Sequence, residues 1–171
     1  MKRIAIAMLT VCCIATVWSS EDGKNLLGKK WRLYKSGVGK VIIQKDGTIA
    51  CELSESGKKN ASGVQQTIVL NQKTPKAIFI SAECKAEKVL GKASRNFSIY
   101  MDVKHTDGTS SWGKGLNFTT GTYDWKKFSA TYVPKKPIKS ISFLFLLRRS
   151  NSGKAWFRNA ACKEVEVKKK K

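Results

Sequence analysis

The segment FSIYMDVK, residues 97–104, decides the fold class because its apolar and polar side chains alternate without a break. In an extended chain, successive side chains point to opposite faces, so such a segment has one apolar and one polar face. The apolar set is Phe97, Ile99, Met101 and Val103, and the polar set is Ser98, Tyr100, Asp102 and Lys104. The segment is therefore predicted to be a β-strand that is buried on one side only.

The same two-residue period recurs along the chain, with turn-forming glycine, proline and aspartate residues between the segments. Predicted strands cover residues 48–53, 64–70, 76–83, 97–104, 125–133, 138–147 and 155–165. No stretch keeps the 3.6-residue period of an amphipathic helix, and no internal repeat or second domain is visible. Many short strands separated by turns predict an all-β sandwich or barrel.

Three parts of the chain are expected from its composition: a signal peptide at residues 1–20, one β domain at 21–166 and a lysine tail at 167–171. Lys2 and Arg3 precede an apolar run at residues 4–17, as in a secretory signal peptide. That run is shorter than the roughly 20 residues of a membrane-spanning helix, and Val11 is a poor fit for lipidation at Cys12. The mature chain is expected to be secreted or extracytoplasmic, with no transmembrane segment.

The charge balance is strongly basic, with 33 Lys and Arg residues against 12 Asp and Glu residues and a net charge of +21. Removal of Lys2 and Arg3 with the signal peptide lowers the net charge to +19. Such an excess favours polyanionic partners. The cations are spread over nearly every loop instead of forming a stripe with aromatic residues, which argues against nucleic acid, as does a secreted location.

Three of the five cysteines, Cys51, Cys84 and Cys162, remain after removal of the signal peptide. No Cys-x-x-Cys spacing typical of zinc sites occurs. The cysteines are expected to be small buried residues with at most one disulfide. The pairing favoured for that disulfide is Cys84–Cys162, because both residues lie in predicted strands.

Sequence signatures of catalysis are sparse. His105 is the only histidine, and no nucleophile elbow, metal-binding cluster or phosphate-binding glycine loop appears. A glycosidase needs two carboxylates across a cleft, and Asp102 with Asp107 or Asp124 would be the candidates. Asp107 and Asp124 stand at predicted turns, where aspartate is common for local hydrogen bonding. Binding is therefore favoured over catalysis.

The region between Tyr100 and Trp125 mixes aromatic rings with planar polar side chains, the combination that holds sugar rings and their hydroxyl groups. Tyr100 and Asp102 share the polar face of their strand, and the others lie on the connection that follows. The predicted ligand-binding residues are Tyr100, Asp102, His105, Trp112 and Asn117. The alternative for the tryptophans is that they close the ends of the core, and this alternative is favoured for Trp125.

An ordered series of short motifs runs through the second half of the chain. The motifs are Asp107-Gly108-Thr109, Trp112-Gly113, Phe118, Gly121-Thr122, Asp124-Trp125, Pro134, Pro137-Ile138-Lys139, Arg148-Arg149 and Gly153-Lys154-Ala155-Trp156-Phe157. This series resembles the CBM4/9-like carbohydrate-binding modules within the galactose-binding-like sandwiches, and the resemblance covers roughly residues 25–165. It implies an antiparallel β-sandwich of jelly-roll type, glycan binding on a face or at the loops, and often a structural calcium ion.

The sequence departs from that family where acidic residues are usual, because Arg158-Asn159 and Lys29-Lys30 stand in their places. A cation at Arg158 would repel calcium, so no cofactor is expected. The basic excess favours sulfated or uronic polysaccharides, with Arg148-Arg149 and Lys135-Lys136 as candidate contacts, although a generally basic, solvated surface gives the same composition. The predicted function is a secreted, non-catalytic carbohydrate-binding domain. The alternatives are a small glycan-active enzyme, and an envelope or adhesion protein that binds polyanions by charge.

Overall fold

The computed structural model describes residues 23–34 and 39–166, and these residues contain ten β-strands and no helix. The strands are β1 (Arg32–Leu33), β2 (Lys40–Ile43), β3 (Ile49–Leu53), β4 (Ala61–Val69), β5 (Ala77–Leu90), β6 (Phe97–His105), β7 (Ser110–Asn117), β8 (Gly121–Tyr132), β9 (Ile138–Arg148) and β10 (Ser152–Val165). The all-β prediction is confirmed. The predicted signal peptide, 1–20, and lysine tail, 167–171, lie outside the described residues. No helix in the described ranges has the length and apolarity needed to span a membrane.

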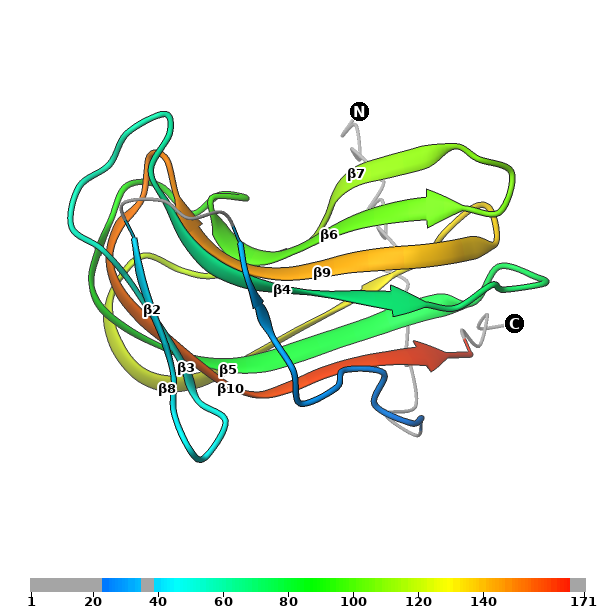
Figure 1. Ribbon diagram of the computed structural model, residues 1–171, viewed down its shortest axis with the longest axis horizontal. Coiled ribbons are helices and arrows are strands. Elements are labelled where there is room, and N and C mark those ends of the chain that lie inside the picture. The colour runs from blue at the N-terminus through cyan, green and yellow to red at the C-terminus, as the bar shows by residue number, and fades with distance from the viewer. Residues whose placement is uncertain (1–22, 35–38, 167–171) are drawn as a thin grey trace, which may run out of the picture.

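The strands form two five-stranded sheets that pack face to face. One sheet has the order β1-β4-β9-β6-β7 and the other the order β2-β3-β10-β5-β8, and the paired strands run antiparallel. Figure 1 shows the two layers, with β4, β9, β6 and β7 in one and β5 and β10 in the other. The chain is therefore an antiparallel β-sandwich, as its resemblance to the jelly-roll modules implied.

Side-chain alternation accounts for the way the sheet that contains β6 and β9 faces the core. On β6, Phe97, Ile99, Met101 and Val103 are all buried in the main hydrophobic cluster, whereas Tyr100 and Asp102 remain partly exposed. On β9, Ile141, Phe143, Phe145 and Leu147 point into the same cluster. A shift of one residue in either strand would turn this apolar set outward, so burial fixes the register.

Aromatic rings from both sheets meet at the centre of the sandwich. The ring of Phe145 stacks on that of Phe157 with centroids 4.5 Å apart and planes inclined by 9°. Phe118 lies beside both, with centroid distances of 6.5 Å to Phe145 and 5.3 Å to Phe157. All three side chains are fully buried. Each buried phenylalanine is worth about 1.5–3 kcal/mol through removal of its apolar surface from water.

Strand β7 differs from the sequence prediction, which treated residues 110–117 as part of a connection. These residues pair with β6 along most of their length, although polar residues and two glycines obscure the period. Gly115 has a φ of 134°, and a Cβ atom there would collide with the carbonyl oxygen of Ile99. The glycine is thus required for the close approach of β7 to β6. The short edge strands β1 and β2 were also not predicted.

The pairing favoured for a disulfide, Cys84–Cys162, is not formed in this structure, where Cys51, Cys84 and Cys162 are all free and buried. Cys84 and Cys162 do lie in strands, but they are not cross-strand neighbours. Cys84 is opposite Phe157, and Cys162 is opposite Ile80. Burial raises the pKa of each of the three thiols to about 12.

Removal of the Phe145 ring is expected to destabilise the fold strongly. The substitution Phe145→Ala leaves a cavity against Phe157 and should lower the free energy of unfolding by about 3–5 kcal/mol. Urea or guanidinium unfolding followed by tryptophan fluorescence measures the change. Val69→Ala, at a side chain that is 67% exposed, is the control and should change stability by less than about 0.5 kcal/mol. Equal losses in the two variants would contradict the central role of the Phe145 stack.

The buried cysteines are expected to resist alkylation in the folded protein. Because their pKa values are raised to about 12, very little thiolate forms at pH 8, and solvent does not reach the sulfur atoms. Iodoacetamide treatment followed by peptide mass spectrometry should find Cys51, Cys84 and Cys162 unmodified in buffer and modified in 6 M guanidinium. A Cys84–Cys162 disulfide peptide in a non-reducing digest would contradict the free thiols.

Candidate functional site

The outer face of the β1-β4-β9-β6-β7 sheet carries rows of polar and aromatic side chains. One cross-strand row runs Arg32, Gln65, Leu144 and Tyr100, and the next runs Thr67, Ser142 and Asp102. Leu144 and Leu146 are buried but belong to no inner core cluster, so they form an apolar floor on this outer side. We call this surface the Tyr100 face, and its central members are Tyr34, Gln65, Tyr100, Asp102, Ser142 and Arg148.

Arg148, at the end of β9, lies between two tyrosines on the Tyr100 face. The central carbon of its guanidinium group is 5.0 Å from the ring centroid of Tyr100 and 5.8 Å from that of Tyr34. Its Nη1 donates a hydrogen bond of 2.9 Å to the hydroxyl of Tyr34. Arg148 is 9% exposed, and among the described residues its buried Nε has no hydrogen-bond partner and its guanidinium no carboxylate partner. Cation–π contacts thus hold both rings in place.

The hydroxyl of Tyr100 remains protonated near neutral pH. Burial is the first cause that raises the pKa of Tyr100, and the negative charge of Asp102 on the same strand is the second. Asp102 Oδ1 in turn accepts a hydrogen bond of 3.2 Å from the backbone N–H of Gly113 on β7. Tyr100 therefore places an aromatic ring and its hydroxyl group beside the carboxylate of Asp102, which can accept hydrogen bonds.

The structure separates the five residues that the sequence predicted as one site. Tyr100 and Asp102 lie on the Tyr100 face, and Asn117 is exposed opposite Ser98 at the β7 edge of the same sheet. Trp112 is 62% exposed and lies where the register between β6 and β7 shifts. His105, the last residue of β6, is only 4% exposed and alternates with the buried Val103 and Met101, not with Tyr100 and Asp102.

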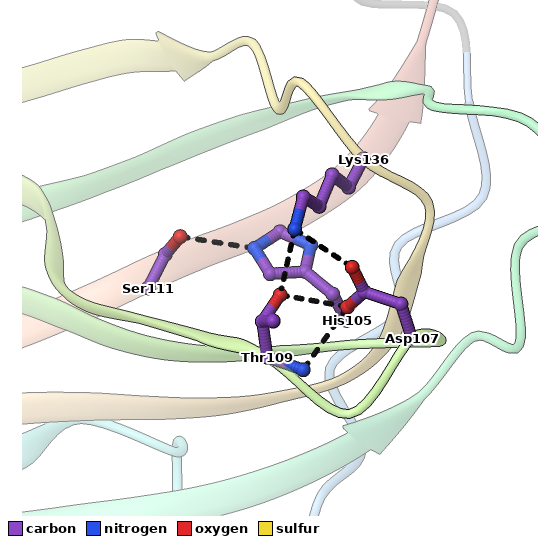
Figure 2. Close-up of polar contacts among 5 residues, drawn as sticks. All are labelled: His105, Asp107, Thr109, Ser111 and Lys136. Carbon is purple, nitrogen blue, oxygen red and sulfur yellow. Dashed lines mark hydrogen bonds and ion pairs between the residues drawn. The ribbon is translucent and has the colours of Figure 1, made fainter.

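His105 lines a cavity of about 390 Å³ where the edge strands β7 and β8 approach each other. We call it the edge pocket; its lining residues are His105, Thr109, Ser110, Ser111, Lys114, Tyr132, Val133, Lys135 and Lys136. Figure 2 shows the hydrogen bond of 2.9 Å between His105 Nε2 and Ser111 Oγ. It also shows Lys136 bound to the turn, with its Nζ 2.7 Å from Asp107 Oδ2 and 3.3 Å from Thr109 Oγ1.

Of the carboxylates suggested for a glycosidase, Asp102 and Asp124 lie on opposite sheets. Lys136 and Thr109 lower the pKa of Asp107 far below its usual range, and the Trp125 backbone N–H and Lys85 lower the pKa of Asp124. Asp124 lies on β8 of the opposite sheet, away from Asp102 on β6. A glycosidase acid needs a raised pKa, so these shifts run in the wrong direction for Asp107 and Asp124.

A second aromatic surface, on the outer face of the other sheet, was missed by the sequence interpretation. This Trp groove is lined by Gln44, Asp46, Thr48, Lys85, Glu87, Trp125, Trp156 and Arg158. Trp125, which was expected to close the core, lies outside it, and the Arg158 guanidinium covers its ring at 3.9 Å. Trp156 alternates with the buried Ala155 and Phe157, and that pattern could have placed it on the outer face.

Arg158 and Asn159 stand where the resemblance implied acidic calcium ligands, and Arg158 forms an ion pair with Glu83. Arg158 Nε donates to Glu83 Oε2 at 2.7 Å, and Asn159 Nδ2 donates to Glu83 Oε1 at 3.1 Å. No group of three or more histidine, cysteine or acidic side chains that could hold a metal ion occurs in the described part of the chain. Glu83 thus already has two hydrogen-bond donors from the protein itself.

Two carbohydrate-binding modules share this two-sheet arrangement. A CBM4 structure superposes with a TM-score of 0.54 and 18% identity, over 80% of this chain and 87% of the other. The CBM22-1 xylan-binding domain of Paenibacillus barcinonensis Xyn10C has a TM-score of 0.54 and 12% identity, over 85% and 97%. The chain has the fold of a carbohydrate-binding module.

The same fold also occurs inside larger proteins. The enzymatically active domain of bacteriophage CBA120 tailspike protein 4 matches with a TM-score of 0.55 and 12% identity, over 82% of this chain. This chain spans 21% of the tailspike chain. No model of a known protein family matches the sequence, and no curated protein is significantly similar to it. The likeness to these structures is therefore one of fold.

Proposed function

We propose that this protein is secreted and binds an extended carbohydrate, without catalysis, on the Tyr100 face. The observation that carries the proposal is the pair of tyrosine rings held by Arg148 beside the Asp102 carboxylate. A flat ring packs against the apolar face of a sugar, and the neighbouring polar groups bind its hydroxyls. Gln65, Thr67 and Ser142 extend the row of hydrogen-bonding groups across the sheet, as a polymer lying on the face requires.

The fold supports this proposal, because one of its structural neighbours is described as a xylan-binding domain. The apolar run at residues 4–17 after Lys2 and Arg3 supports export. The three hydrogen bonds that Lys136 and Thr109 make to Asp107, and the ion pair of Asp124 with Lys85, favour structural roles for these carboxylates over acid catalysis. A small glycan-active enzyme is the weaker alternative.

An acidic polysaccharide is the preferred ligand class within this proposal. The net charge of +21 attracts polyanions, and Arg149 and Lys135, two of the candidate contacts, are exposed. The other two candidates differ, because Arg148 is enclosed by tyrosines and Lys136 is paired with Asp107. Charge alone would also serve an envelope or adhesion protein, so specificity for sugar rings is the property that separates the two functions.

Removal of the Tyr100 ring is expected to weaken glycan binding. Tyr100→Ala deletes one aromatic platform and should raise the Kd for the best-bound polysaccharide roughly tenfold, as for a central contact residue. Affinity electrophoresis and calorimetry with xylan, β-glucan and polygalacturonate measure the change. Trp156→Ala is the matched control, because it removes a partly exposed ring from the opposite sheet and should leave the Kd within twofold, about 0.4 kcal/mol.

The reverse result would contradict the assigned surface. If Trp156→Ala abolishes binding and Tyr100→Ala does not, the ligand occupies the Trp groove instead of the Tyr100 face. Backbone chemical shifts of both variants confirm that each remains folded.

Glycan binding on the Tyr100 face is expected to persist in part at high salt. Raising NaCl from 0.05 M to 1 M shortens the screening length from roughly 14 Å to about 3 Å and removes long-range attraction. Contacts to the tyrosine rings do not depend on salt, so a glycan array should retain the same ring-specific ligands with weaker signals. Loss of all signals at 1 M NaCl would favour the charge-based envelope or adhesion function.

A further inference from the structure

The edge pocket has more cationic side chains than its own carboxylate can neutralise. Lys114, Lys135 and Lys136 line it, and Asp107 pairs with Lys136 alone. Within the described residues, Lys114 and Lys135 have no ion-pair partner, and the Lys114 ammonium lies 5.9 Å from the ring centroid of Tyr132. A half-enclosed cavity with two unpaired ammonium groups attracts an anion more strongly than an open surface does.

His105 forms a wall of this cavity and has unsatisfied hydrogen-bonding capacity. Its Nε2 is held by Ser111 Oγ at 2.9 Å, whereas its Nδ1 is buried and has no partner among the described residues. Buried polar atoms without partners are rare in folded proteins and are often explained by a missing water or ligand. The side chain is 4% exposed, so bulk water does not reach this atom.

Hydroxyl groups complete the lining. Ser110 and Ser111 are the first two residues of β7, and Thr109 belongs to the preceding turn. Hydrogen bonds from Thr109 to Asp107 Oδ1 at 2.7 and 3.0 Å fix the geometry of that turn. Hydroxyl and ammonium donors around one cavity suit a group with several acceptor oxygens, as carboxylates and sulfates have.

We infer that the edge pocket binds an acidic substituent, a carboxylate or sulfate, carried by a glycan chain. This inference rests on the proposed carbohydrate-binding function and adds a second, charged contact at the β7 edge of the sheet that forms the Tyr100 face. Lys114 and Lys135 supply the charge, and Ser110 and Ser111 supply neutral donors. The two contacts together select polysaccharides that bear acid groups over neutral ones.

The single histidine of the chain makes the pocket directly observable. With the ¹⁵N-labelled full chain at constant pH, the imidazole signals belong to His105 alone, and they report on events in the pocket. The probes are an oligogalacturonate for carboxylate, a dextran sulfate oligosaccharide for sulfate and an unsubstituted dextran oligosaccharide as the neutral ligand. The acidic probes should shift the His105 signals saturably, and the neutral probe should leave them unchanged.

Matched charge variants test whether the pocket, and not the overall charge, is responsible. The double substitution Lys114→Gln with Lys135→Gln removes the two unpaired ammonium groups and should raise the Kd for the acidic probes about tenfold or more, as loss of charged hydrogen bonds does. The control is Lys73→Gln with Lys139→Gln, which removes the same charge from exposed residues outside the pocket and should change the Kd less than threefold. Backbone spectra verify the fold of each variant.

Each result has a defined meaning. The inference is overturned if acidic probes bind without moving the His105 signals, or if the control pair weakens binding as much as the pocket pair. If glycans bind and only Tyr100→Ala weakens them, the pocket assignment fails while the proposed function stands. If the wild-type chain binds none of the glycans, neutral or acidic, the proposed function fails and the pocket inference fails with it. A larger effect with one acidic probe identifies the acid group as carboxylate or as sulfate.

Discussion

The stack of Phe145 on Phe157 joins the two sheets at their central strands, β9 and β10. Each of these strands is the third of five in its sheet, so every other strand is hydrogen-bonded outward from this pair. Because side chains alternate along a strand, fixing these two rings inside also fixes what points outside. Leu144, Leu146 and Arg148 then face outward on β9, and Trp156 and Arg158 face outward on β10. Which side chains lie on the two outer surfaces thus depends on the register of β9 and β10.

The two candidate contacts differ in how the fold holds them. The Tyr100 face lies mainly over β4, β9 and β6, the inner strands of its sheet, and its rings are fixed by Arg148, which is itself almost enclosed. The edge pocket lies where β7 and β8 end their sheets, and its walls come from a turn, two edge strands and the link to β9. A binding surface on packed strands is preorganised, so little entropy is lost there when a ligand binds. The edge pocket depends instead on the hydrogen bonds of Asp107, Thr109 and Lys136.

The sequence alone predicts those parts of the fold that depend on local alternation. Residues 97–104 and 138–147 form strands as expected, and the same alternation correctly places Tyr100 and Asp102 outside the core. Strand β7 was not predicted, because Gly113 and Gly115 interrupt the alternation of apolar and polar residues and its pairing depends on the neighbouring strand β6. The outcome for Cys84 and Cys162 has a similar cause. Both lie in strands, but whether two cysteines face each other depends on register over 78 residues of separation, which one sequence does not reveal.

The same reasoning explains which members of the site were missed. Tyr34 reaches Arg148 from the other end of the chain, and the sequence holds no periodic signal that links them. His105 was grouped with Tyr100 because it was placed on the connection after the strand, whereas it is the last residue of β6, lies on the side of Val103 and lines the edge pocket. Local pattern therefore defines the strands, and long-range pairing defines which side chains meet.

Net charge is a poor guide to where an anion would bind on this molecule, because the cations differ in what already surrounds them. Arg148 is enclosed by two tyrosine rings, Lys136 is paired with Asp107, and Arg158 is paired with Glu83. Their charges still contribute to long-range attraction, but binding to them at short range requires displacement of an existing partner. Lys114 and Lys135 have no ion-pair partner among the described residues and share a cavity, so a ligand's acid group gains two new contacts there without breaking an ion pair. Specificity for acidic glycans would thus arise from the placement of two lysines and not from the total of 33 basic residues.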